Sequence, residues 1–455
     1  MHTPKIAMKT IIVSLLIAAS VASQASSANT SLISNLPYPT GSCADVWADG
    51  DLVFLARRGQ GFDIIDVSDP TNPNILFSGR SDLFIQDIQS VGDTLYCANA
   101  SGNGQGLVIF DITDPSSPTE IGSYSSFNLL TSYSLVAQGN HAYVASQFSN
   151  LVAVLDVSNP ASPSEVATLS SQSPISQIRD VTVDGDKLYV SWLSGGFEIH
   201  DITNPASPTL DLAHSTPTSL VHNCWPLTGG THIVTTDEVS GGYLRVWDIS
   251  SPTNVVEVSQ WRAHGVAVMH NLFMVGSLAF ITNYTEGLRI VDLSNPSAPE
   301  EAGFYDTFPM VNPFQFGAWG VYPGRDEIYV ADFNTGFYVI DFKPATATLS
   351  AASTSLNWGD TIMLTLEADA GATTIDMPGM ADLSFSVVQL PNLQPASLLQ
   401  LFGTVPAGAS SGSLPRNFPL PVGNFPAYDV VFTLTIADQT NGHVFDQDSV
   451  TISLN

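Results

Sequence analysis

Basic residues are scarce in this sequence. The 455-residue chain has 13 Lys and Arg against 42 Asp and Glu, which gives a formal net charge of −29 at pH 7. A surface of that sign repels nucleic acid and anionic lipid, so we expect no nucleic-acid partner. It attracts cations, although a saline habitat would explain the charge equally well. Only 12% of the residues are charged and 44% are hydrophobic, which indicates a globular protein rather than a disordered one.

Cysteines and long apolar runs are also scarce. The three cysteines, Cys43, Cys97 and Cys224, have no metal-binding or redox spacing, and we expect them to be small buried side chains. No segment reaches the roughly twenty apolar residues of a membrane-spanning helix, so we predict no membrane span. The P-loop, GxGxxG, CxxC and EF-hand motifs are absent, and with them the motif-based case for the commonest nucleotide, redox and calcium sites.

Residues 1–28 are typical of a secretory signal peptide. Lys5 and Lys9 precede the apolar run Ile11–Val21, and small residues follow in Ala22–Ala28. Met8 could equally be the true start of the chain. We therefore expect a secreted protein, extracellular or periplasmic.

One motif, first seen as GFDIIDVSDPTNP from Gly61, occurs seven times. Alternating apolar residues precede an aspartate, and six copies continue with Ser or Thr and then proline, the pattern of a strand that ends in a turn. The aspartates lie 44 to 49 residues apart, a period typical of four-stranded propeller blades. They are Asp66, Asp111, Asp156, Asp201, Asp248, Asp292 and Asp341. We expect them to cap turns rather than to bind metal.

A further pair of strands precedes each motif, and the segment after the proline-rich turn supplies a fourth. Seven four-stranded units closed in a ring leave few exposed sheet edges, so residues 29–343 are predicted to form a seven-bladed β-propeller. The last blade lacks a fourth strand, and Leu32–Leu36, just before the first blade, is an unassigned strand. We expect this segment to pair with the last blade and close the ring. Alternating strands over residues 344–455 predict an immunoglobulin-like β-sandwich. The predicted fold class is all-β, a propeller followed by this C-terminal sandwich.

Positions at which the repeats differ are the candidates for function, because repeated positions build the scaffold. When the seven repeats are aligned, two adjacent columns of positions mark the start of each inner strand, near the central channel. The first contains Ala44, Gln86, Tyr133, Arg179, His222, His270 and Ala318, and the second contains Asp45, Asp87, Ser134, Asp180, Asn223, Asn271 and Trp319. The binding site predicted in blades five to seven comprises His222, Asn223, Asp237, Glu238, His264, His270, Asn271 and Trp319.

A divalent metal is a possible cofactor. His222, His270 and Asp237 could ligate it, because imidazole nitrogen and carboxylate oxygen are ordinary ligands of transition metals. The alternative is that the second column bonds to the backbone of adjacent blades and that the histidines pack beside it. No closely spaced motif such as HExxH decides between these readings.

The repeated motif resembles that of the LVIVD-repeat propellers, and residues 220–341 resemble more closely the secreted choice-of-anchor B family. The segments that carry this resemblance are His222–Asn223, Thr235–Ser250, His270–Asn271, Gly287–Thr307 and Gly317–Pro323. The resemblance implies a secreted or surface propeller whose C-terminal part often carries an anchor. It implies no established activity.

The function that we expect is a secreted or cell-surface, non-catalytic propeller that binds or adheres to a protein or glycan partner. The alternative is a metal-dependent, hydrolase-like enzyme with a His/Asp/Glu site on the propeller face of blades five to seven. Its ligands or acid–base groups would be His222, His264, His270, Asp237 and Glu238. The sequence does not distinguish the first hypothesis from a purely structural role in an envelope or matrix assembly.

Overall fold

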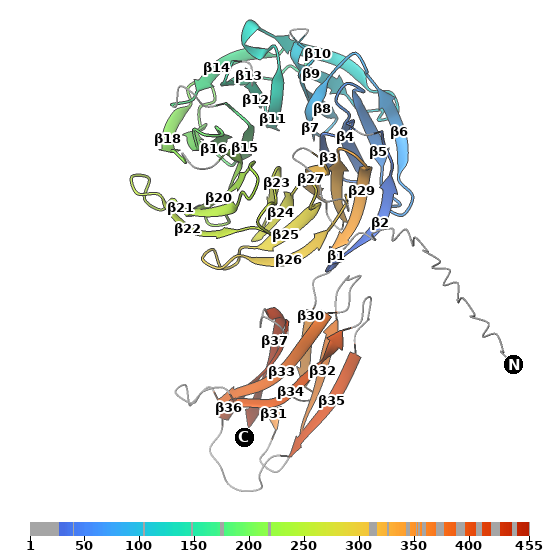
Figure 1. Ribbon diagram of the computed structural model, residues 1–455, viewed down its shortest axis with the longest axis vertical. Coiled ribbons are helices and arrows are strands. Elements are labelled where there is room, and N and C mark those ends of the chain that lie inside the picture. The colour runs from blue at the N-terminus through green and yellow to red at the C-terminus, as the bar shows by residue number, and fades with distance from the viewer. Residues whose placement is uncertain are drawn as a thin grey trace, which may run out of the picture.

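Seven β-sheets stand around a central channel in the computed structural model (Figure 1). The structure describes residues 27–39, 41–102, 105–146, 149–172, 177–216, 220–308, 316–324 and 327–342, together with the C-terminal strands named below. Most of the predicted signal peptide, residues 1–26, lies outside the described residues. Among the described residues the only helix is the short 3-10 helix η1 (Phe127–Leu129).

Each blade has four antiparallel strands in order from the channel outward. The inner strands are β3 (Asp45–Asp49), β7 (Ile85–Val91), β11 (Ser132–Gln138), β15 (Asp180–Asp184), β19 (Val221–Pro226), β23 (Leu272–Val275) and β27 (Ala318–Pro323). The second strands are β4 (Leu52–Ala56), β8 (Thr94–Asn99), β12 (His141–Ser146), β16 (Lys187–Ser191), β20 (His232–Asp237), β24 (Leu278–Thr282) and β28 (Glu327–Asp332). The third strands are β5 (Phe62–Asp66), β9 (Gln105–Asp111), β13 (Leu151–Asp156), β17 (Phe197–Asp201), β21 (Leu244–Asp248), β25 (Leu288–Asp292) and β29 (Gly336–Phe342). The outermost strands are β6 (Asn74–Gly79), β10 (Thr119–Ser125), β14 (Ser164–Ser170), β18 (Thr209–His214), β22 (Val256–Trp261), β26 (Glu300–Tyr305) and β2 (Thr30–Leu36).

The ring is closed by the start of the chain. Strand β2 pairs with β29 of the seventh blade, with Leu32 opposite Ile340, which confirms the predicted closure by Leu32–Leu36. Two residues at the end of the predicted signal peptide also pair with a blade. Ser27 and Ala28, assigned to it from the sequence, form β1 (Ser27–Ala28), which adds a fifth strand to the sixth blade beside β26.

The core is divided among the interfaces between blades. Because side chains alternate along a strand, each sheet sends one apolar face to the preceding blade and the other to the next. Among the described residues, one cluster of buried side chains lies at each of the seven interfaces. Each large aliphatic side chain in them stabilises the fold by about 1.5–3 kcal/mol. The three cysteines are buried in three different clusters.

The repeated aspartates cap the turns after the third strands. In six repeats the carboxylate accepts a hydrogen bond of 2.8 or 2.9 Å from the backbone N–H two residues later. These acceptors are Asp66, Asp111, Asp156, Asp201, Asp248 and Asp292. The turn after Asp341 lies outside the described residues. Accepting this bond lowers the pKa of the Asp66 carboxyl, because it favours the ionised form.

The C-terminal strands form two further sheets. One contains β30 (Thr346–Ala351), β32 (Thr361–Asp369) and β35 (Gly412–Pro419). The other contains β31 (Ser355–Leu356), β33 (Met377–Val387), β34 (Ala396–Val405), β36 (Tyr428–Asp438) and β37 (Val444–Leu454). Strand β30 contacts β36 and β37 of the second sheet. The immunoglobulin-like type of this region stays a prediction.

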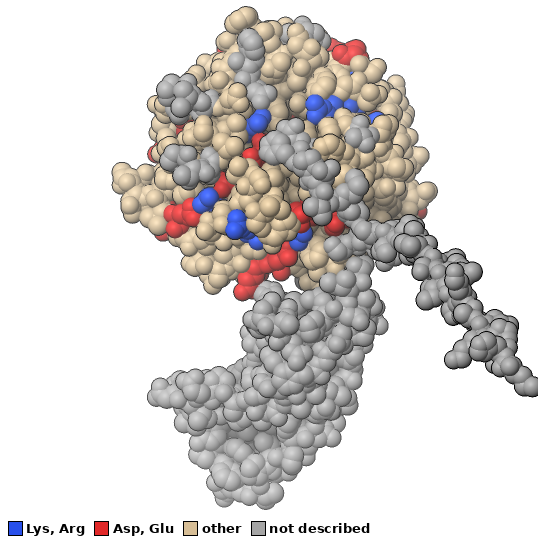
Figure 2. Space-filling model, viewed as in Figure 1, with Lys and Arg blue, Asp and Glu red and all other residues tan. Residues whose placement is uncertain are grey.

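Charged side chains are sparse on the face shown in Figure 2, where Asp and Glu form small groups beside isolated Lys and Arg. No helix in the described part of the chain has the length and apolar character needed to cross a bilayer.

Candidate functional site at the channel mouth

A β-bulge begins the inner strand of every blade. In blades two, three, five and seven the pairing with the second strand shifts at the first residues of the inner strand. In the other three blades, two residues of the inner strand likewise lie opposite one residue of the second strand. There the backbone N–H of Ala44, Arg179 or His270 donates to a carbonyl of the second strand. A bulge adds one unpaired residue and re-aims its side chain. The added side chains converge in the channel, and we call them the mouth ring: Ala44, Gln86, Tyr133, Arg179, His222, His270 and Trp319.

The mouth ring corrects the sequence alignment of blade seven. Trp319 was placed in the same column as Asn271, but Gly320 holds that position, because it lies opposite Ala331 just as Asp45 lies opposite Ala56. Trp319 therefore belongs with His222 and His270. Gly320 is required there, because a Cβ atom would lie 2.7 Å from the Cα atom of Asp45.

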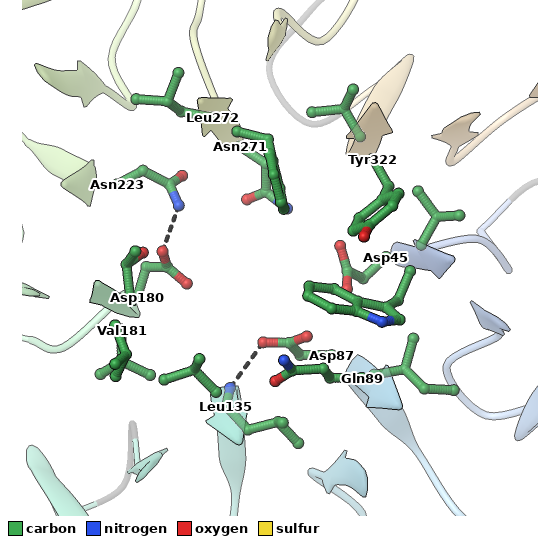
Figure 3. A pocket seen from close by; sticks show the side chains of 18 of the residues that line it. Asp45, Asp87, Gln89, Leu135, Asp180, Val181, Asn223, Asn271, Leu272 and Tyr322 are labelled. Carbon is green, nitrogen blue, oxygen red and sulfur yellow. Dashed lines mark hydrogen bonds between the residues drawn. The ribbon is translucent and has the colours of Figure 1, made fainter. Parts of the chain in front are cut away.

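A second ring of polar side chains lies one residue further along each inner strand (Figure 3). We call it the carboxyl ring, and its members are Asp45, Asp87, Ser134, Asp180, Asn223 and Asn271. Asp180 accepts hydrogen bonds from the Ser134 hydroxyl, at 2.6 Å, and from the side-chain amide of Asn223. Asp87 accepts one from the backbone N–H of Leu135 at 2.7 Å. A cavity of about 340 Å³ opens beside this ring, and one of about 30 Å³ lies between the two rings.

The carboxyl ring holds protons to unusually high pH. Enclosure by the protein raises the pKa of Asp180 to about 7, and the neighbouring Asp87 carboxyl contributes, while hydrogen bonds oppose the shift. Enclosure, with the adjacent Asp87 as the second cause, also raises the pKa of Asp45 well above its ordinary value.

His222 and His270 form the buried centre of the site. Both rings are at most 3% exposed, and their centroids lie 4.1 Å apart. The Nδ1 atom of His270 donates to the backbone oxygen of Trp319 at 2.9 Å. The Nδ1 atom of His222 lies 2.8 Å from the side-chain oxygen of Asn223, whose amide nitrogen is directed at Asp180. Burial lowers the pKa of both histidines, so each ring is neutral and carries its lone pair on Nε2.

Glu238, rather than Asp237, joins the two histidines. Its Oε2 atom lies 3.8 Å from Nε2 of His222 and 3.2 Å from Nε of Arg179, while its Oε1 atom accepts a 2.8 Å hydrogen bond from Tyr284. The proposed ligand Asp237 is directed elsewhere, because its carboxylate accepts a 2.8 Å hydrogen bond from Arg245. Glu238 directly follows the end of β20, and its backbone N–H donates to the Leu220 carbonyl at 2.8 Å, next to the start of the inner strand β19.

His264 is not part of the cluster. Its side chain is 46% exposed and its Nε2 atom lies 2.6 Å from the Glu286 carboxylate. Asn223 and Asn271 line the channel as expected, Asn223 as the link between His222 and Asp180, and Asn271 on the wall of both cavities.

Two further residues of the site, Arg58 and Tyr284, lie outside the predicted set of binding residues. Both have left-handed backbone conformations, with φ of 46° and 37°, and both pair with the next blade through an isolated β-bridge. The guanidinium of Arg58 lies 5.3 Å from the centroid of Trp319, which in turn stacks on Phe333 at 4.5 Å. Leu193 has the same backbone conformation and the same kind of bridge, so this is a feature of the scaffold that also places Arg58 and Tyr284 at the mouth. The sequence could have indicated both residues by their position, because each lies two residues after the end of a second strand, and these strands end at the mouth.

The arrangement combines three kinds of chemistry. Two neutral imidazoles and a carboxylate can ligate a metal or accept hydrogen bonds. Two guanidinium groups, of Arg58 and Arg179, can bind an acidic group. The partly buried ring of Phe333, which stacks on the buried Trp319, adds flat apolar area.

Comparison with protein-family models identifies LVIVD repeats at residues 40–79, 85–126, 131–170, 177–216 and 269–307, which are blades one, two, three, four and six. Among solved structures the chain is similar to the WD40 propeller domain of Doa1, with 13% identity and a TM-score of 0.52 over 69% of this chain and 97% of that one. It is similar to the Cps50 (Swd1) propeller domain of Myceliophteria thermophila, with 12% identity and a TM-score of 0.51 over 69% of this chain and 99% of that one. It is also similar to a chain of the mitotic checkpoint complex, with 14% identity and a TM-score of 0.53 over 74% and 98%. At such identities the likeness shows the propeller fold alone. A search of curated proteins found no match.

Proposed function

Because this chain is a seven-bladed β-propeller built from LVIVD repeats, we propose that it is an exported, non-catalytic protein that binds a partner at the cell surface with its channel mouth. One observation carries the proposal: side chains of widely different chemistry, from alanine to tryptophan, converge at one place on a repeated scaffold. Stability alone does not require such variety, since each repeat contacts its neighbours in nearly the same way.

The chemistry of the mouth favours a protein partner that presents an acidic group. Arg58 lies 4.8 Å from the centroid of Phe84 as well as near the stacked Trp319 and Phe333 rings. Arginine and large aromatic residues are the side chains that most often dominate binding energy at protein interfaces. Arg58 is notable on a protein with a net charge of −29, because it offers positive charge at the mouth, whereas Arg179 is paired with Glu238.

The test is binding of the fluorescently labelled protein to the surface of cells of its own source. We expect Arg58→Glu to reduce binding at least tenfold, because it reverses a charge at the mouth. Lys187→Glu is the matched control: Lys187 begins β16 at the opposite end of the channel, where it pairs with Asp201 at 2.8 Å and Asp211 at 2.6 Å. Equal loss in both variants, or none in either, would rule out the mouth as the binding surface. A glycan array then separates a sugar ligand from a protein partner.

Export is part of the proposal. The basic, apolar and small-residue order of the first 28 residues supports a cleaved signal peptide. Because Ser27 and Ala28 belong to β1, we expect cleavage before Ser27. Mass spectrometry of the N-terminus of the exported protein checks this, and an N-terminus beyond Ala28 would contradict it.

The alternative function, a metal-dependent enzyme, is favoured by the approach of His222, His270 and Glu238. A screen of ester, lactone and phosphate hydrolysis tests it. Turnover that is lost in a His222→Ala/His270→Ala double variant would replace the non-catalytic proposal by this one.

A further inference from the structure

Within the described part of the chain, two buried lone pairs at the channel mouth have no hydrogen-bond donor. The Nε2 atoms of His222 and His270 are both enclosed and unpartnered, whereas both Nδ1 atoms are engaged. Leaving a buried acceptor unpaired destabilises a fold, and such groups in native proteins usually face an ion or a water molecule. The adjoining cavity of about 30 Å³ has room for one small species.

A carboxylate completes the set. One ligand atom from each of His222, Glu238 and His270 can be chosen such that all three lie within 4.8 Å of one another. Ligands bound tetrahedrally to zinc at about 2.0–2.1 Å lie about 3.4 Å apart. The His222–Glu238 separation of 3.8 Å is close to this value.

The histidines are held as metal ligands usually are. A ligating histidine donates its other ring nitrogen to a carbonyl or carboxylate, which fixes the tautomer and the orientation of the ring. His270 donates to the carbonyl of Trp319, and the His222–Asn223–Asp180 chain performs the same task for His222. Tyr284 in turn fixes the carboxylate of Glu238 through its hydroxyl.

We propose that Nε2 of His222, Nε2 of His270 and a carboxylate oxygen of Glu238 bind one divalent transition-metal ion of the zinc type at the channel mouth. Imidazole ligands select such an ion over calcium and magnesium, which take all-oxygen sites. The inference goes beyond the proposed binding function, because it requires no macromolecular partner and is tested with the metal alone.

Arg179 limits the affinity. Its guanidinium lies 3.2 Å from Glu238 Oε2 and competes with a cation for this oxygen. At an effective dielectric constant of about 20, a unit charge about 5 Å from a divalent ion changes its binding by well over tenfold. Replacing Arg179 by an uncharged residue should therefore tighten binding of the metal, an effect that a purely structural Arg179–Glu238 ion pair does not predict.

The experiment uses the full exported chain, purified without a metal-affinity tag and dialysed against a chelator. Zn²⁺ is titrated by calorimetry with excess Mg²⁺ present to occupy weak acidic sites on the surface. We expect one equivalent of Zn²⁺ to bind, at least 100-fold more weakly in His222→Ala and in His270→Ala, and at least tenfold more tightly in Arg179→Gln. His264→Ala, which removes an exposed histidine beside a carboxylate, is the matched control and should bind as the unchanged protein does.

Absence of stoichiometric Zn²⁺ binding would overturn the proposal and leave a water molecule as the species between the imidazoles. Retention of full affinity in the His222→Ala/His270→Ala double variant would overturn it as well, as would a loss confined to His264→Ala. Glu238→Gln keeps the size of the side chain and serves if a histidine variant does not fold, since it should weaken Zn²⁺ at least tenfold. Cell binding by the metal-free protein is measured separately, so failure of the metal site and failure of the proposed function are distinguishable.

Discussion

Asp180 should make the propeller less stable as the pH rises from about 4 to about 7. Its carboxyl accepts hydrogen bonds from Ser134 and Asn223 in the carboxyl ring, and enclosure raises its pKa to about 7 from an ordinary value of 3.8. Asp180→Asn removes the titrating group and can keep both contacts. The new amide would donate to the Ser134 hydroxyl, which can turn to Asp87, and its oxygen would accept from Asn223.

The direction of this change in stability follows from the number of protons bound by the folded and unfolded states. Below the unfolded pKa of 3.8 the carboxyl is protonated in both states, and it has no effect on the pH dependence. As the pH rises towards 7 the unfolded chain releases its proton and the folded protein keeps it, so the free energy of unfolding falls by about 1.4 kcal/mol per pH unit. The difference between 3.8 and about 7 corresponds to about 4 kcal/mol. This is an upper limit, because Asp180 borders the 340 Å³ cavity, which can admit water.

The assay is urea unfolding followed by tryptophan fluorescence, between about pH 4 and about pH 8. Six of the seven tryptophans lie between Asp45 and Phe342, so the signal reports the propeller. The stability of Asp180→Asn relative to the unchanged protein should rise by up to about 4 kcal/mol over this range. Asp156→Asn is the control, because the lowered pKa of that turn aspartate leaves it ionised in both states above about pH 5. A difference for Asp180→Asn that stays constant within about 0.5 kcal/mol would refute the raised pKa.

Three other predictions concern the scaffold. Gly61→Ala should cost more than about 2 kcal/mol in urea unfolding, because φ is +83° and the new Cβ would lie 2.0 Å from the Gly79 carbonyl oxygen, whereas Gly50→Ala, in open space, should cost only about 1 kcal/mol. Equal costs would contradict the close approach. All three cysteines should resist a thiol reagent until the protein unfolds, since they are buried and burial raises the pKa of the Cys43 thiol to about 12; labelling of the native protein would contradict this. Deleting β2 (Thr30–Leu36) should expose the edge of β29 and cause aggregation on size-exclusion chromatography, and a monomer with an unchanged melting temperature would show that closure is dispensable.

The fold was predictable because the information for it is repeated. Each copy of the motif predicts the same strand and turn, so an ambiguous copy is resolved by comparison with the others. The period alone indicates a propeller blade. Ring closure followed from a count of strands, since one was missing at the end and one was left over at the start. The β1 strand was not predictable in this way, because Ser27 and Ala28 pair through their backbone and carry no apolar pattern.

The site was predictable only in part, because bulges displace it from the register of the repeats. His222 and His270 were found as departures from the neighbouring blades. Trp319 was placed one residue out of column, since an extra residue in a strand is invisible to an alignment that counts residues. The choice between Asp237 and Glu238 likewise depends on where β20 ends and on the partner that each carboxylate finds, and adjacent acidic residues give no indication of this.

Arg179 connects the two functions that the mouth can serve. While its guanidinium lies beside Glu238, the carboxylate is neutralised and the histidines are the remaining acceptors at the centre of the ring. An acidic group of a partner that draws Arg179 away would free Glu238 for a cation, and a bound cation would in turn release Arg179 for the partner. Because binding free energies are reciprocal, each ligand should then strengthen the other by the same factor. Metal and partner would thus act at one site as cooperating ligands rather than as competitors.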